Sequence, residues 1–479
     1  MERRLLTLWL IVWLGFGACA VPAAFAAAAD EDPAVEDEED ADLGNLLNEP
    51  SAPAPTTPPS GAKPNRLPLR YEGEVRGYLW SPSDYDDQWH TIDRMDLNGW
   101  GRIGAIDVAG RLKIDYQDIE DEDKADAELR ELYARYPVHS AAGRRLDVSL
   151  GKKMIYWGKG DEVRPIDRVS PQDLSAFLFY DLNERKTGRV GAFADLQMTG
   201  RLRFEGFWSP YFEASDTPGL GDFFEPTLLR RLADNGIAIG EPREPDTWSA
   251  DAGYGARLIF SVFKADLALY AFQGYDPNPT YGVDRLGTFN GLPIIPLSVA
   301  ATHPRMTLYG ADIERTVGPF VLRAEAAYQP DGALFNLDWS RDLSLLLTEP
   351  DGLVEKRQLQ YVFGMDKNDF LVRNLFVNLQ LLGSHIYDHD PRMTAEKDQT
   401  GMTATVRYSF LDSKVTAWYR YIILFENSDQ RHHAEIDYKL AVWAQVGLGA
   451  VVFDGTDDTA YFGQYDDRDC IYAKLKLLF

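Results

Sequence analysis

The sequence contains little cysteine, little histidine and no long apolar run after its first residues. Among 479 residues there are two cysteines, Cys19 and Cys470, and seven histidines. Two cysteines exclude a framework of several disulfides and a cysteine-based zinc site within one chain. Beyond residue 29, no stretch approaches the roughly 18 apolar residues that a membrane-spanning helix needs. A helical membrane protein is therefore excluded as well.

Basic residues are also in the minority. Lys and Arg number 49 against 75 Asp and Glu, which gives a formal net charge of −26. Nucleic acid is therefore not an expected partner, because binding its phosphates requires a basic surface. An apolar fraction of 45% excludes global disorder.

The usual signs of an enzyme are absent too. The sequence has no serine nucleophile elbow and no glycine-rich phosphate loop, and its histidines fall mostly in predicted loops. The segment His385-x-x-Asp388-His389-Asp390 has the side chains to bind a divalent cation, but nothing fixes its geometry, so a solvated loop is the favoured interpretation. We predict no enzymatic activity, no cofactor and no metal site.

The first 29 residues have the three parts of a secretory signal peptide. Arg3 and Arg4 precede an apolar core at 5–16, and Ala24-Phe25-Ala26 forms a cleavage site with small residues. A lipoprotein signal at Cys19 is the alternative. Residues 30–66 are acidic and then rich in proline, which predicts a disordered periplasmic linker before a barrel domain at 67–479.

From residue 67 onward, apolar and polar residues alternate with a period of two. In the last segment, Leu475 and Leu477 point to one face, whereas Lys474 and Lys476 point to the other. About 18 such segments occur, each near the length of a tilted membrane strand. They begin near residues 70, 94, 109, 130, 145, 188, 200, 252, 264, 304, 318, 355, 371, 401, 412, 431, 442 and 470.

The connections between these segments alternate between short and long. Short turns are expected at 108–110, 199–200, 317–319, 367–369 and 411–413, and long polar loops at 210–250, 274–303 and 330–354. Short periplasmic turns opposite long external loops are typical of outer-membrane barrels. We therefore predict an all-β fold: a closed transmembrane antiparallel barrel of about 18 strands in the outer membrane, surrounded by lipid.

The last segment also carries an assembly signal. It alternates and ends on an aromatic residue, Phe479, and in this it resembles the C-terminal signal that the bacterial barrel-assembly machinery reads. The resemblance implies that this machinery is a partner.

The most distinctive stretch is the predicted third external loop, within 150–183. Its two glycines, Gly158 and Gly160, allow a bend, and Ser170-Pro171 predicts the start of a short helix. The loop resembles the inward-folded constriction loop of general porins. Its pattern W-G-x-G-D…P-x-D…P-x-D-L also resembles a motif of uncharacterised porin-like families of proteobacteria. The resemblance implies that charged loop residues line a narrowed pore: Asp161, Arg164, Asp167, Arg168 and Asp173. The alternative is a structural clamp, since turns and caps use the same residue types.

Inward positions assigned by alternation contain more Arg and Lys than Asp and Glu. Rings of such residues favour anionic solutes, although pairing with acids on neighbouring strands would explain them equally well. The arginines expected to line the lumen are Arg102, Arg111, Arg189, Arg203, Arg257, Arg323, Arg407 and Arg420.

Together these features predict a porin-like channel for passive diffusion of small hydrophilic solutes, with a preference for anions left open. The alternative is an export or conduit barrel for an anionic polysaccharide or a periplasmic partner protein. The strand number and the Arg-rich lumen, but no motif, resemble alginate-type export porins. A homotrimer also stays open.

Overall fold

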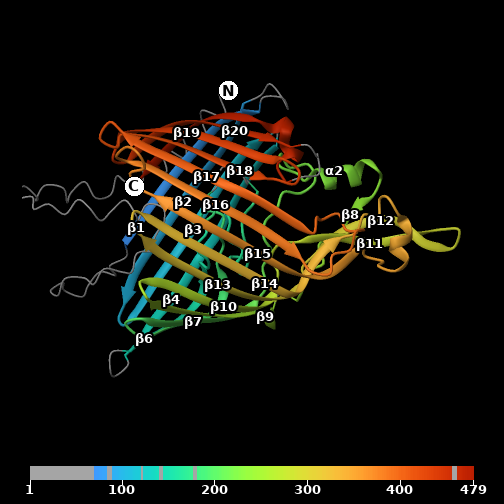
Figure 1. Cartoon of the computed structure of the whole chain (residues 1–479), viewed down its shortest axis with the longest axis horizontal. Helices are drawn as coiled ribbons and strands as arrows, with labels where there is room; N and C mark the ends of the chain where they lie inside the picture. The colour runs from blue at the N-terminus through green and yellow to red at the C-terminus, as the bar shows by residue number, and fades with distance from the viewer. Residues whose placement is uncertain are drawn as a thin grey trace, which may run out of the picture.

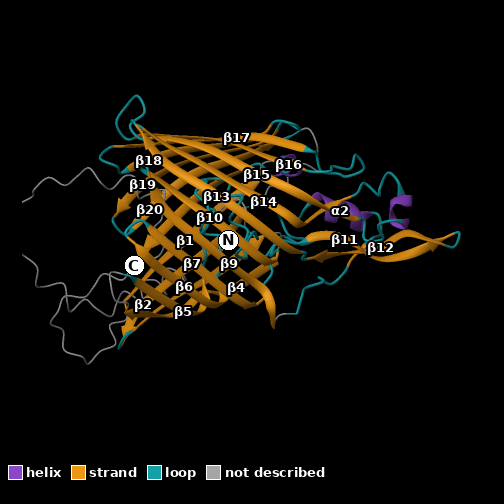
Figure 2. Cartoon of the chain, turned by 60° about the horizontal axis from the view of Figure 1, so that its bottom comes forward, coloured by secondary structure: helices purple, strands orange, loops and turns teal. Residues whose placement is uncertain are grey.

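The computed structural model describes residues 70–82, 89–119, 122–139, 144–175, 181–246, 248–455 and 461–479. The predicted signal peptide and linker lie outside the described residues. Eighteen strands form one antiparallel sheet that closes on itself, because the last strand pairs with the first. Figures 1 and 2 show the resulting barrel. At the seam, Gly73 and Phe479 exchange two backbone hydrogen bonds of 2.8 and 3.0 Å.

The barrel strands follow the chain order. They are β1 (Arg70–Pro82), β2 (His90–Ile103), β3 (Ile106–Ile119), β4 (Glu122–His139), β5 (Arg145–Lys153), β6 (Arg189–Thr199), β7 (Leu202–Tyr211), β9 (Trp248–Val262), β10 (Ala265–Tyr275), β13 (Arg305–Val317), β14 (Phe320–Asn336), β15 (Leu353–Lys367), β16 (Leu375–Ile386), β17 (Asp398–Phe410), β18 (Val415–Leu424), β19 (Asp429–Ala441), β20 (Ala444–Asp454) and β21 (Cys470–Leu478).

The predicted fold class and strand number are confirmed, and each predicted segment corresponds to one strand. One predicted turn is wrong. Residues 108–110 lie inside β3, where Gly110 pairs with Leu132 of β4. The turn is formed instead by Gly104, whose φ of 62° suits a residue without a side chain.

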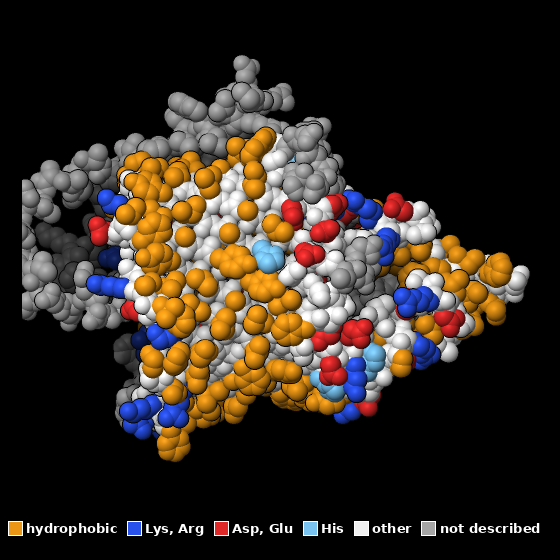
Figure 3. Space-filling model, turned by 45° about the horizontal axis from the view of Figure 1, so that its top comes forward, with side chains coloured by type: hydrophobic (Ala, Val, Ile, Leu, Met, Phe, Trp, Pro, Cys, Tyr) orange, Lys and Arg blue, Asp and Glu red, His pale blue; other side chains and the backbone are white. Residues whose placement is uncertain are grey.

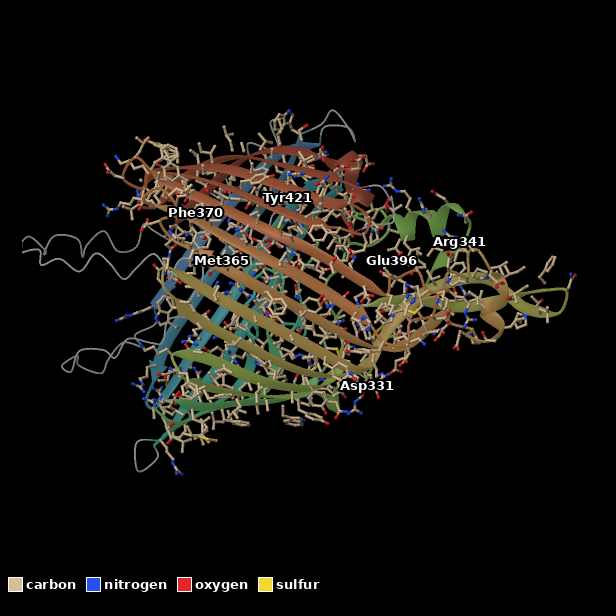
Figure 4. All side chains as sticks on the ribbon, in the orientation of Figure 1. Asp331, Arg341, Met365, Phe370, Glu396 and Tyr421 are labelled. Carbon is tan, nitrogen blue, oxygen red and sulfur yellow. The ribbon has the colours of Figure 1, made fainter. Side chains whose placement is uncertain are left out.

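Short turns lie at one end of the barrel, here called the turn end, together with Phe479 and the start of β1. Long loops lie at the opposite end, the loop end. On the face in Figure 3, hydrophobic side chains cover most of the barrel, and charged ones lie along its turn-end edge and among the loops at the opposite end. Figure 4 places Met365 and Phe370 near the turn end, and Asp331, Glu396 and Arg341 at the loop end.

The long loops contain structure that the sequence pattern did not predict. A three-stranded sheet of β8 (Ala238–Ile239), β11 (Thr280–Phe289) and β12 (Leu292–Thr302) projects beyond the loop end, beside α2 (Thr227–Asp234) (Figure 1). Two short 3-10 helices, η1 (Leu343–Leu347) and η2 (Gly463–Arg468), lie in later loops. Within the described residues, no helix is both long and apolar enough to cross a membrane.

Candidate functional site

The segment between β5 and β6, residues 154–188, crosses the interior of the barrel and is here called the lumen loop. Its Lys159 amide donates a 2.8 Å hydrogen bond to Glu325 of β14. Its Glu184 carboxylate lies 2.6 Å from the Arg76 guanidinium of β1. These two strands lie far apart in the closed sheet order. The loop therefore reaches well-separated walls of the barrel.

One side of the lumen loop is held by apolar contacts. Trp157, Ile166 and Val169 are fully or almost fully buried in a cluster with inward residues of β6, β7, β10, β13 and β14. The Trp157 ring lies 5.1 Å from the Tyr270 ring and 5.8 Å from the Phe207 ring, centroid to centroid. Burial of this size stabilises a loop by several kcal/mol in aggregate, at roughly 1.5–3 kcal/mol for each large side chain.

Glu325 holds the bend of the loop. Its carboxylate accepts hydrogen bonds from the backbone amides of Lys159 and Ile166, both at 2.8 Å, and from that of Gly160 at 3.2 Å. Gly158 has a φ of 81°, and a Cβ there would lie 2.6 Å from the Glu325 carboxylate. A side chain at position 158 would therefore displace the carboxylate from the bend.

Ion pairs hold the other side of the loop. Arg420 of β18 pairs with Asp181 and lies 3.2 Å from Glu162, so one guanidinium binds two separate limbs of the loop. The same limbs are joined directly, because the Arg164 guanidinium donates to the Asn183 side chain at 2.7 Å. The two limbs of the loop are therefore fixed both to the barrel wall and to each other.

Glu184 contacts three of the first four strands, β1, β2 and β4. Its side chain binds Arg76, and its backbone carbonyl accepts from Arg94 at 3.2 Å and from Arg130. Burial raises the pKa of the Glu184 carboxyl, but the attraction of Arg76 outweighs it and leaves that pKa at about 2. Glu184 is therefore ionised at any physiological pH.

The helix predicted from Ser170-Pro171 is not found in the described part of the loop. Gln172 and Asp173 form isolated β-bridges with Lys186 and Asp216. The Asp173 carboxylate accepts from the amide and hydroxyl of Ser175 and pairs with Lys113 of β3. The two β-bridges take the place of the backbone hydrogen bonds that a helix would form at these residues. Residues 176–180, where the helix would continue, lie outside the described residues.

The five predicted constriction residues all lie in the lumen loop, and all are paired. Asp161 accepts from Asn378 at 2.6 Å and lies 3.3 Å from Arg323, and burial raises the pKa of its carboxyl. Asp167 pairs with Lys186, and burial lowers the pKa of that ammonium group. Arg168 binds Gln329 at 3.0 Å and pairs with Asp276. With Arg164 and Asp173 as described above, each residue contributes to holding the loop.

The predicted lumen arginines mostly have acidic partners. Arg203 pairs with Asp195 and Glu205, and Arg257 lies 3.7 Å from Glu205. Arg102 lies 3.2 Å from Asp107 at the turn end, and Arg323 binds Glu314 and Asp366.

Three other arginines use different partners. Arg111 donates to Asn98 at 2.8 Å, and Arg189 donates to the Val169 carbonyl. Arg407 lies over the Phe376 ring, 5.3 Å from its centroid, and makes no ion pair within the described chain.

Several residues of the site were missing from the sequence-based prediction. Glu162, Asp181, Glu184 and Lys186 join the loop to the wall or to itself. The sequence shows these residues as closely spaced charges in one loop. It does not show which residues they bind, because partners such as Arg76 and Arg420 lie on strands distant in sequence.

The His385 segment does not gather its side chains. His385 binds Asp398 at 2.6 Å, Asp388 binds Arg357, and Asp390 binds Arg392. A search of the described residues finds no cluster of three metal-ligating side chains.

Comparison with solved structures finds porins. A double mutant of the Rh. blastica porin is 12% identical, with 86% of this chain and 100% of that chain covered and a TM-score of 0.38. OccAB3 of Acinetobacter baumannii is 10% identical, with 86% and 99% covered and a TM-score of 0.47. OpdK of Pseudomonas aeruginosa, solved with vanillate, is 11% identical, with 86% and 98% covered and a TM-score of 0.46.

Among curated proteins, no match is found. A family model does match, over residues 29–479, and its description is "Protein of unknown function (DUF1302)". The match extends over the whole barrel and the lumen loop within it. The chain therefore belongs to the DUF1302 family.

Proposed function

We propose that the protein is a passive channel of the bacterial outer membrane for small hydrophilic solutes, with the lumen loop as its constriction. The observation that carries the proposal is a charged loop that crosses a closed barrel from Glu325 to Arg76. Such a barrel exposes apolar side chains to lipid and charged ones to water in its lumen. A loop across that lumen then sets the width and charge of the path.

The described residues support a channel better than a catalyst. Charged groups of the loop are used in pairs that fix its position, and loop backbone amides are held by a wall carboxylate. A wide sleeve for a polysaccharide or a partner protein would need this bridge to leave the lumen, which would break both its apolar and its ionic contacts. The channel is therefore the function that the geometry favours.

A preference for anions is the finer part of the proposal. Its support is Arg407, an inward arginine over an aromatic ring without an ion pair in the described chain. Acids of the loop and wall offset most of the other lumen arginines. We expect weak rather than strong selectivity, carried by the few arginines with spare charge.

The test is replacement of residues 159–183 by a short Gly-Ser bridge, followed by single-channel recording in planar bilayers. We expect a higher conductance and a weaker ion preference, because the bridge across the lumen is gone. A matched control shortens the hairpin of β11 and β12 at its tip. This deletion removes residues at the loop end that lie outside the lumen. Equal conductance of the loop deletion and the intact chain, with normal folding, would show that the lumen loop is a clamp and not the constriction.

A further inference from the structure

Four of the seven described turns at the turn end carry a large, exposed apolar side chain. Phe263, Leu371, Leu411 and Val442 are 85%, 85%, 64% and 98% exposed, and each belongs to a different hairpin. We call these four residues the turn rim. Exposed single apolar residues are common, but here the same feature recurs on four hairpins at one end of the barrel.

The backbone conformation of these turns does not favour bulky apolar residues at their tips. Phe263, Leu371 and Leu411 have φ values of 53°, 65° and 53°. Gly, Asn and Asp adopt this left-handed region most readily, and bulky side chains do so at a cost. These bulky side chains therefore occupy left-handed backbone positions while they are largely exposed.

The turn rim continues the apolar outer face of the barrel. Val262 and Leu440 are exposed at the last outward positions before the turns of Phe263 and Val442. On β15 and β16, the outer face at the loop end carries polar pairs, Arg357 with Asp388 and His385 with Asp398. Exposed apolar residues also lie near the loop end, among them Trp248 and Ile471, so the turn rim extends an apolar outer face that spans the barrel.

The height of the apolar band supports the same conclusion. On β15 the apolar outward positions run from Leu359 to Met365. That run is about 20 Å along the strand and about 15 Å along the barrel axis at the usual tilt, whereas the apolar band of a membrane barrel is about 25 Å tall. The next outward position is Lys367, whose ammonium group lies over the Phe370 ring, and the band approaches this height when the turn with Phe370 is included (Figure 4).

Basic side chains accompany the apolar tips. Lys264 follows Phe263 directly, and Lys414 ends the turn that begins with Leu411. Both lysines are exposed, and neither makes an ion pair with another described residue. Apolar side chains that enter the acyl region, with lysines that reach back to the phosphates, fit the edge of a phospholipid leaflet.

We propose that the turn rim inserts into the phospholipid leaflet around the turn end, and that Lys264 and Lys414 bind the phosphate groups of that leaflet. This inference rests on the membrane location in the proposed function. It assigns a lipid-binding surface to turns that would otherwise lie in water.

The first test places a reporter at the rim. In a chain with Cys19→Ala and Cys470→Ala, Leu371→Cys is labelled with an environment-sensitive dye and the protein is inserted into vesicles of phosphatidylethanolamine and phosphatidylglycerol. The matched control is Phe289→Cys, at the exposed tip of the β11–β12 hairpin. We expect blue-shifted emission at position 371, quenching by nitroxide-labelled lipid, and a several-fold lower iodide quenching constant than at position 289.

Equal iodide quenching at the two positions would overturn the inference. If position 371 were then protected only in native outer membranes, the occupant would be a periplasmic protein rather than lipid. Conductance of the same vesicles separates this result from the proposed function. A conducting barrel with position 371 in water would overturn the lipid-binding surface alone. Lipid contact at position 371 without conductance would overturn the channel alone.

The second test concerns the lysines. We expect the intact chain to unfold at higher urea in vesicles with phosphatidylglycerol than in vesicles of phosphatidylcholine alone. Lys264→Gln with Lys414→Gln should lose much of this difference, whereas Arg341→Gln at the loop end should keep it. An unchanged difference in the double variant would show that these lysines do not bind the phosphates.

Discussion

The backbone amide of Ile166 donates a 2.8 Å hydrogen bond to the carboxylate of Glu325, although the two residues are 159 positions apart. Two further amides, those of Lys159 and Gly160, donate to the same carboxylate. One wall side chain thus fixes the bend of the lumen loop. The loop position should be correspondingly sensitive to this single residue.

Glu325→Ala should therefore release the bend. It leaves three amides without their acceptor, and a buried unpaired donor costs about 1–3 kcal/mol. We expect noisier and larger single-channel currents with the barrel still folded. Glu205→Ala is the control, because Glu205 pairs with Arg203 and Arg257 on the wall. Identical currents in the two variants would contradict the role of Glu325.

Neutralising Arg164 and Arg168 together should shift ion selectivity toward cations. Both side chains lie in the lumen loop, and their loss leaves Asp276 and other acids of the site unbalanced. The measurement is the reversal potential in a salt gradient, for Arg164→Gln with Arg168→Gln. Arg341→Gln removes an exposed charge at the loop end and should leave the reversal potential unchanged. A double variant that behaves like this control would place both arginines outside the path.

Leu475→Arg should impair folding into bilayers much more than Gln445→Arg. Leu475 pairs with Val446 on the outer face, whereas Gln445 pairs with Lys476, whose ammonium group reaches Glu74 in the lumen. An arginine on the lipid face costs roughly 2–4 kcal/mol near the membrane centre. Folding yields in vesicles compare the same new residue on the two faces, and equal yields would mean that the faces are assigned the wrong way round.

The contact between Arg76 and Glu184 predicts a pH window. The pKa of the folded Glu184 carboxyl is about 2, below its ordinary value of 4.5. The ion pair therefore stabilises the loop fully above about pH 4.5, and this stabilisation is lost as the pH falls toward 2. The current fluctuations that depend on this pair should increase as the pH falls below about 4.5. Glu184→Gln, which is neutral throughout, should show no transition in this window, and a transition that persists in it would belong to another group.

Much of the barrel could be predicted from the sequence, because successive residues of a strand face the membrane and the lumen in turn. Apolar and polar side chains therefore alternate along each strand. The arm formed by β11 and β12 was missed, although Asn290-Gly291 is a typical hairpin dipeptide and both residues have positive φ values, 51° and 82°. The prolines of β12 made the segment resemble a loop. A stronger weight on the turn dipeptide would have found it.

The candidate site was predictable only in part. The closely spaced charges at 161–173 identified the loop, but not what each charge binds, because partners such as Arg323 and Lys113 come from distant strands. The helix at Ser170 was wrong for the same reason, since β-bridges with residues 186 and 216 depend on tertiary structure.

The seam between β1 and β21 sets the order in which the barrel can assemble. It joins Gly73 to Phe479, and the entropy of closing a loop grows with the number of residues enclosed. We expect this ladder to form after the hairpins, whose strands are neighbours in sequence. Until then both edge strands offer unpaired backbone groups to any other strand nearby. The interval before closure is therefore when the chain is most exposed to misassembly, and when a chaperone or an assembly factor has the most to protect.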